Sequence, residues 1–219
     1  MSLWSDLLLE AQRHAHGEAL DALQRLQVAA LTGQVSGMTG TLLDCAERIG
    51  QAEEKVSSGA EIARMSELLT LAQFGAGSIG SAVAAIYNAP ESAPGLEALF
   101  VSKFLTELVL QRRTYPALFP ADLLRKHGIG RQDLGEQSGR PVLADIVERA
   151  RETAARVPEP GAVSWDGDLN GLLLYERKLL IKRLDRLTAN PCVGQPIDLN
   201  IWDRLATAIS LRLRRRPSA

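Results

Sequence analysis

Cysteine is scarce in this sequence, and what little there is argues against both disulfides and metal sites. The 219 residues contain two cysteines, Cys45 and Cys192, far apart and without the paired spacing of a zinc site. Such a chain is expected in a reducing, cytoplasmic compartment. His14 and His16 lie two residues apart, so they point to different faces of a helix and predict no metal centre.

The chain also lacks an excess of charge and any long apolar run. The formal net charge is −1, which gives no electrostatic reason to expect a nucleic-acid partner. No stretch approaches the roughly 18 uncharged apolar residues of a membrane span, so none is predicted. Near the amino end, Asp6 and Glu10 stand where a secretory signal would carry basic residues.

Few β-branched residues and no alternating apolar pattern are present, whereas helical periodicity runs through nearly every segment, so we expect an all-α protein. In the first half, the pattern predicts one long amphipathic helix over 3–31 and a second near 41–55. Ser58 with Glu61 has the spacing of a capping box and predicts a third helix. The buried face of that third helix is expected to contain Ile62, Met65, Leu68, Leu69 and Ala72.

The second half is expected to hold the central helix of the bundle. The helix predicted over about 95–113 carries apolar residues around nearly its whole circumference, which is typical of a helix buried on all sides. Further helices are predicted over 140–157, 169–188 and from Asp198 to about Arg216. The helix over 140–157 is expected to have outer ion pairs Asp145–Arg149 and Glu152–Arg156 and an apolar stripe of Leu143, Ile146, Val147, Ala150 and Ala154. The inward residues expected on the helix over 169–188 are Leu169, Leu173, Leu180, Leu184 and Leu187. No boundary or repeat divides the chain, so residues 1–219 are interpreted as a single all-helical domain.

One segment, FGAGSIGSAVAAIY, is unusually rich in small residues for a helix. Glycine costs a helix about 1 kcal/mol relative to alanine, so the cluster needs a reason. It can allow close helix packing or a kink, or it can expose bare backbone to a bulky ligand. The residues concerned are Gly75, Gly77, Gly80, Ser81 and Ala84.

From about Gly75 onward, the order of motifs resembles the squalene/phytoene synthase family. The resemblance covers 58–216 and is weak over 1–57. It rests on Gly77-Ser78-Ile79-Gly80, Leu118-Phe119-Pro120, Leu124-Arg125-Lys126-His127-Gly128-Ile129, Asp133-Leu134, Leu174-Tyr175 and Leu199-Asn200-Ile201-Trp202-Asp203-Arg204-Leu205. It implies an isoprenoid synthase fold, here truncated at the amino end, and the head-to-head condensation of two prenyl diphosphates with magnesium.

The motifs that would hold that magnesium are degraded. Placing Pro120 on the family's loop proline puts Glu107 and Gln111 at the two aspartates of one metal-binding helix, and no aspartate pair in the right context supplies the other. A plain alternative is a Lys103–Glu107 salt bridge with Gln111 continuing a polar stripe, and Asp6 and Glu10 as a solvated helix face. We therefore expect no catalytic residue and no cofactor, with magnesium only if the chain is an enzyme.

Candidate substrate-binding residues follow from the resemblance, with Glu107 as the one candidate metal ligand. They are Gly77, Gly80, Lys103, Glu107, Gln111 and Tyr175.

Three functional hypotheses remain open from the sequence. The first is a non-catalytic binding or assembly factor with an apolar cavity for an isoprenoid or lipid and a protein partner; a mitochondrial complex I assembly factor resembles the same synthases. The second is an active isoprenyl transferase with unusual or partner-supplied metal ligands. The third is a helical interaction module that shares only the fold.

The carboxyl-terminal run of Arg212, Arg214, Arg215 and Arg216 predicts either peripheral contact with an anionic membrane or a solvated helix end.

Overall fold

The structure, a computed structural model, describes residues 2–13, 15–35, 38–157 and 167–189, with only the backbone described for 167–172. Every regular element in these ranges is helical, which confirms the all-α prediction. The longer helices are α1 (Leu3–Gln12), α2 (Gly17–Thr32), α3 (Gly40–Ser57), α4 (Met65–Ala72), α5 (Ser78–Ile86), α6 (Ala93–Leu110), α7 (Ala121–His127), α8 (Arg140–Ala154) and α9 (Gly167–Ala189).

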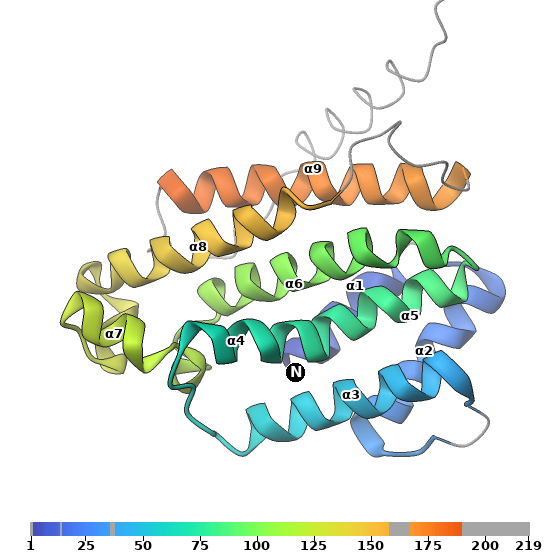
Figure 1. Cartoon of the computed structure of the whole chain (residues 1–219), viewed down its shortest axis with the longest axis horizontal. Coiled ribbons are helices and arrows are strands. Elements are labelled where there is room, and N and C mark those ends of the chain that lie inside the picture. The colour runs from blue at the N-terminus through green and yellow to red at the C-terminus, as the bar shows by residue number, and fades with distance from the viewer. Residues whose placement is uncertain (1, 14, 36–37, 158–166, 190–219) are drawn as a thin grey trace, which may run out of the picture.

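Helix α6 lies at the centre of the bundle, as its all-round apolar pattern predicts. Its side chains are buried at most positions from Gly95 to Val109. Helices α1, α4, α5, α8 and α9 all pack against it, and Figure 1 shows α8 and α9 on one side and α3 with α4 and α5 on the other. The buried side chains of α1 through α9 form one continuous core.

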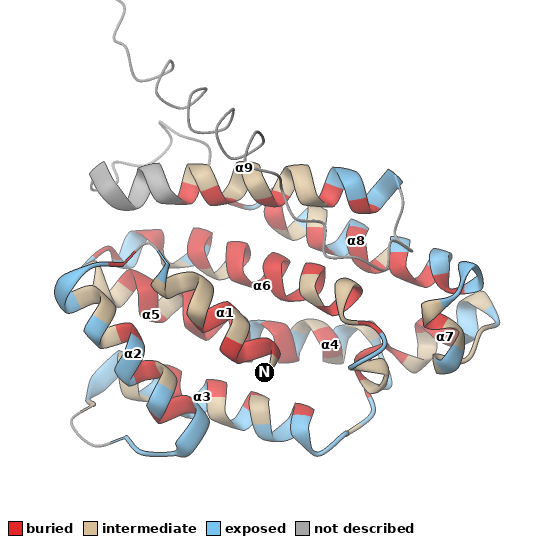
Figure 2. Ribbon diagram, turned by 180° about the vertical axis from the view of Figure 1, so that it is seen from behind, coloured by how far each residue is buried: buried red, intermediate tan, exposed pale blue. Residues whose placement is uncertain are grey.

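The single helix expected over 3–31 is wrong, because the chain breaks between α1 and α2. His16 is extended (φ −136°, ψ 155°), and Gly17 has φ +55°, a conformation that glycine adopts without strain. The break lets α1 turn and lie along α6, where Trp4 stacks on Phe104 with ring centroids 4.7 Å apart. Figure 2 shows α1 near α6 at the front of the view, with buried residues toward its amino end.

The capping box expected at Ser58 and Glu61 is also wrong. Helix α3 extends to Ser57 with Ser58 as its carboxyl-terminal cap, while α4 begins only at Met65. The intervening strand-like segment is held by tertiary bonds: Ile62 donates to Ala117 O (3.1 Å) and accepts from Ala121 N (3.0 Å). Those contacts to a distant loop outweigh the local capping signal.

Helices α4 and α5 are joined by a π-helical turn, Gln73–Gly77, into one helix from Met65 to Ile86. A side chain on Gly80 would place its Cβ 2.5 Å from the backbone of Leu96 and Glu97, and one on Gly75 would meet the Trp4 ring at 2.6 Å. At these two positions, the small residues serve close packing against α6 and α1. The π-turn also gives the segment the local irregularity that the sequence raised as an alternative.

The helix from Met65 to Ile86 is long and apolar enough to cross a membrane by length and composition. No such stretch was expected from the sequence. In the structure, 61% of its most apolar window is buried inside the bundle. A buried core helix has the same composition as a membrane span, so this feature alone assigns the chain to neither environment.

The apolar stripe of α8 is confirmed, but its predicted surface ion pairs are wrong. Leu143, Ile146, Val147, Ala150 and Ala154 are all buried. Asp145 instead accepts from Lys126 (2.7 Å) and His127 (3.0 Å), because α7 lies beside α8. On the outer face, Arg149 pairs with Glu152 at 2.6 Å.

On α9, Leu173, Leu180, Leu184 and Leu187 are buried, as predicted. The expected inward Leu169 side chain, the final helix from Asp198 and the arginine-rich end lie outside the described residues.

Replacing Gly80 with alanine should destabilise the fold by about 1–3 kcal/mol, since the new methyl group meets the backbone of α6 and neither side can yield. The matched control is Gly77→Ala in the same helix, where the methyl group meets only the flexible end of Gln73. Both changes gain the same helix propensity, about 1 kcal/mol. Chemical denaturation checks the difference, and equal stabilities would contradict the packing role of Gly80.

Candidate functional site

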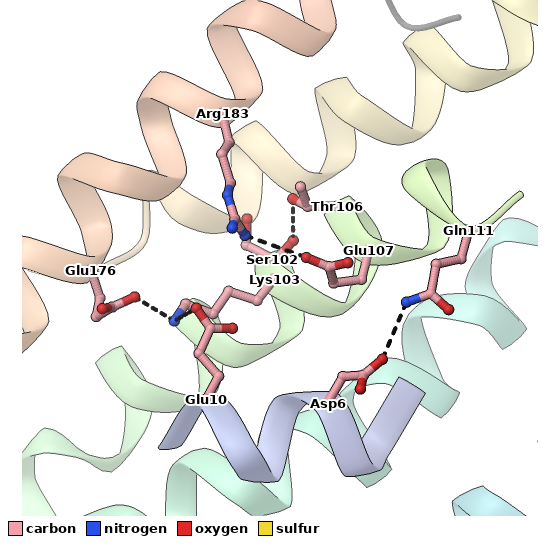
Figure 3. Close-up of polar contacts among 9 residues, drawn as sticks. All are labelled: Asp6, Glu10, Ser102, Lys103, Thr106, Glu107, Gln111, Glu176 and Arg183. Atoms are coloured by element: carbon pink, nitrogen blue, oxygen red, sulfur yellow. Dashed lines mark hydrogen bonds and ion pairs between the residues drawn. The ribbon is translucent and has the colours of Figure 1, made fainter. Parts of the chain in front are cut away.

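Three helices turn polar side chains toward one another beside the core. Lys103, Glu107 and Gln111 follow one another at four-residue spacing along and just past α6, so they share a face. Figure 3 shows this face meeting Asp6 and Glu10 of α1, together with Glu176 and Arg183 of α9. We call these seven residues the polar network.

Lys103 lies at the centre of the polar network and is 5% exposed. Its Nζ donates to Glu10 Oε1 at 2.9 Å and to Glu176 Oε2 at 2.7 Å. Burial on its own would lower the pKa of the ammonium group, but the two carboxylates outweigh that effect and raise the pKa above its ordinary 10.5. Lys103 is therefore a fixed positive charge shared by α1 and α9.

Glu107 experiences the opposite balance. Burial raises the pKa of its carboxyl above the ordinary value of 4.5, and the negative charges of Glu10 and Asp6 add to that shift. Arg183 Nη1, at 3.3 Å, opposes the shift without reversing it. Next along this face, Gln111 Nε2 donates to Asp6 Oδ2 at 3.4 Å.

The structure corrects two sequence expectations at this site. Glu10 is not on a solvated face: its side chain is 17% exposed and paired with Lys103. The expected Lys103–Glu107 salt bridge is also wrong, since Lys103 pairs with α1 and α9 while Glu107 pairs with Arg183.

The partners that sequence reasoning missed are Glu10, Glu176 and Arg183. The four-residue spacing of Asp6 and Glu10, equal to that of Glu107 and Gln111, was a signal for Glu10, and no local pattern indicated Glu176 or Arg183.

The other candidate binding residues do not gather here. Gly80 packs on the first turns of α6 at Leu96 and Glu97, and Gly77 lies against Gln73. Tyr175 is half-buried on α9, next in sequence to Glu176. The candidate set therefore divides between the polar network and a different face of the bundle.

The polar network does not fit a magnesium ion. Magnesium requires several hard oxygen ligands in an octahedral arrangement. Here an ammonium group lies between two of the carboxylates, and Gln111 contributes a neutral amide. Within the residues that the structure describes, no group of three or more His, Cys, Asp or Glu side chains is placed to hold a metal ion.

Comparisons with protein-family models, curated proteins and solved structures find no match to this chain. The resemblance drawn from its motifs therefore stays a prediction.

Replacing Lys103 with methionine should cost about 3–5 kcal/mol of stability, because two mostly buried carboxylates lose their counter-charge. Lys126→Met is the matched control: Lys126 also pairs with a carboxylate, but its side chain is 63% exposed, so a loss of at most about 1 kcal/mol is expected. Adding Glu10→Gln and Glu176→Gln to the Lys103 variant should recover part of the loss. Similar losses for both lysines would refute a central role for Lys103.

Glu107→Gln should leave the fold as stable as the wild type or more stable at neutral pH. The raised pKa means that the folded chain resists ionising Glu107, so stability falls as pH rises from the unfolded value through the folded one. Glutamine removes that loss. Denaturation curves should show the advantage of the variant shrinking as the pH falls through the raised folded pKa and vanishing below the ordinary value of 4.5. An advantage that grows on acidification would contradict the shift.

Proposed function

We propose that this chain is a non-catalytic binding or assembly protein that shares a helical bundle with the squalene/phytoene synthase-like proteins it resembles. The observation that carries the proposal is the Lys103 ammonium seated between Glu10 and Glu176. The resemblance implies magnesium-dependent condensation of prenyl diphosphates, and the polar network gives the reason to expect that this activity is absent.

Condensing prenyl diphosphates requires carboxylates that are free to hold metal ions. Two diphosphates bring several negative charges into an apolar site, and a metal must neutralise the leaving group. In this chain, Glu10 and Glu176 each lie within 3 Å of Lys103, and Glu107 pairs with Arg183. A metal would have to displace a buried ammonium and leave that charge unpaired, which is strongly unfavourable.

A protein partner suits the geometry better than an apolar ligand between α1 and α6. The resemblance implies an isoprenoid or lipid cavity, but Trp4 and Phe104 fill the interface between these helices and are both fully buried. Binding is therefore proposed for the outside of the bundle. A cytoplasmic location, with membrane contact through the arginine-rich carboxyl end, belongs to the same proposal.

One observation favours the alternative, an isoprenyl transferase with unusual or partner-supplied metal ligands. Asp6 lies across from Gln111. Glu10 is close enough to Glu107 for its charge to raise the pKa of Glu107, so the acids of α1 face the side of α6 that carries Glu107. That arrangement is the one that a metal-binding helix pair needs. The Lys103 ammonium group opposes metal binding there. A partner chain would have to supply further carboxylates and let the ammonium group move away from Glu10 and Glu176.

The deciding experiment incubates the full chain with farnesyl diphosphate and magnesium and measures diphosphate release, beside an active synthase as positive control. We expect no release and, by calorimetry, no magnesium-dependent heat with inorganic pyrophosphate at millimolar concentration. Glu107→Gln should behave as the wild type does. Turnover by the wild type that Glu107→Gln abolishes would establish the transferase instead.

A further inference from the structure

The outer face of the helix from Met65 to Ile86 is unusual because it carries no charge beyond Glu67 in its first turn. No charged residue occurs between Glu67 and Glu91, although Thr70, Gln73 and Phe74 are exposed. Exposed faces of helices normally carry charged side chains. Phe74 is 37% exposed and stands near the middle of this face. The face is therefore largely uncharged and offers one exposed aromatic ring that an apolar surface could contact.

Two grooves meet at Phe74. The first lies between α3 and α4, has a volume of about 380 Å³ and includes Ala52 and Leu71 in its lining. The second follows the π-turn and α5, has a volume of about 500 Å³ and includes Gly77, which adds no side chain to narrow it. Both grooves are lined by Thr70 and Phe74, so they adjoin at these two residues, and together they are here called the Phe74 groove. Each volume lies within the range of clefts that bind ligands.

The wall of the Phe74 groove formed by α3 is basic. Arg48 and Lys55 are seven residues apart, so they lie on one side of α3 at a separation of about 10 Å. The Arg48 guanidinium lies 6.0 Å from the centre of the Phe74 ring. In the described part of the chain, no carboxylate comes within ion-pair distance of either cation.

The carboxylates of the opposite wall already hold donors from the chain itself. Glu67 accepts from the backbone N–H of Ala63 at 2.9 Å. Glu97 accepts from Gln73 Nε2 at 2.9 Å and from Ser81 Oγ at 2.5 Å. The two walls therefore differ: α3 carries cations with no ion-pair partner among the described residues, whereas the carboxylates on α4 and α6 already accept hydrogen bonds from the chain.

We propose that the Phe74 groove docks an amphipathic helix of a partner protein whose apolar stripe rests on Phe74. Acidic side chains seven residues apart on one edge of that helix pair with Arg48 and Lys55. This inference rests on the proposed binding role and names its surface. A uniformly anionic polymer fits less well, because Glu67 and Glu97 would repel it, whereas a helix turns only one edge toward α3.

The test uses two labelled model helices that differ only at two positions. Both carry a leucine stripe; one has glutamates seven residues apart at its edge, and the other has lysines there. Fluorescence anisotropy with the full chain should show that the glutamate helix binds with at least about tenfold higher affinity than the lysine helix. The double variant Arg48→Glu/Lys55→Glu should reverse that preference, and Phe74→Ser should weaken binding of both helices.

The matched control is Arg13→Glu/Arg25→Glu, the same charge change at exposed arginines of α1 and α2 away from the groove, which should leave the preference unchanged. Equal affinity for the two helices, or binding of neither, would overturn the proposal. So would binding to anionic phospholipid vesicles that Phe74→Ser abolishes, because it would assign the face to a membrane. The docking result is independent of the diphosphate-release assay, so failure of the groove and failure of the non-catalytic role are told apart.

Discussion

The arrangement of α1, α6 and α9 depends on one buried ammonium group. Lys103 is separated by 93 residues from Glu10 and by 73 from Glu176, yet its Nζ lies within 3 Å of both. Burying any one of these three charges without an opposite charge beside it would be strongly unfavourable. The fold must therefore bring all three together. The cost of desolvating a buried triad offsets much of its attraction, so its effect on the fold is chiefly geometric: the three helices must pack so that Lys103 reaches both carboxylates.

The polar network is not electrically balanced, and the imbalance falls on Glu107. Lys103 is committed to Glu10 and Glu176, which leaves Arg183 to offset Glu107 in the presence of Asp6 and Glu10. A carboxyl whose pKa is raised by burial and by neighbouring carboxylates is a feature that functional sites share with structural ion-pair networks. Here the neighbouring cation and the buried lysine favour the structural origin.

Sequence periodicity correctly predicted the helices whose buried faces follow from their own pattern of apolar residues. The all-round apolar α6 and the stripe of α8 are of this kind. It failed where distant contacts decide. Helical spacing continues through residues 13–17, yet Gly17 turns the chain so that Trp4 can reach Phe104. At the site, four-residue spacing identified Lys103, Glu107 and Gln111 as one face. It could not supply Glu176, because nothing local relates that residue to Lys103.

The π-turn links the closed interior to the open outer face. Gly75 and Phe74 are adjacent, but Gly75 is buried against Trp4 while Phe74 lies exposed beside Arg48. A larger residue at Gly75 would force Trp4 away from Phe104 and open the interface between α1 and α6. Glycine therefore lets the aromatic pair fill the interior, and the one aromatic side chain of this helix segment is left to face outward. Because Trp4 and Phe104 fill the space between α1 and α6, the docking proposed here is directed to the surface, where Phe74 lies.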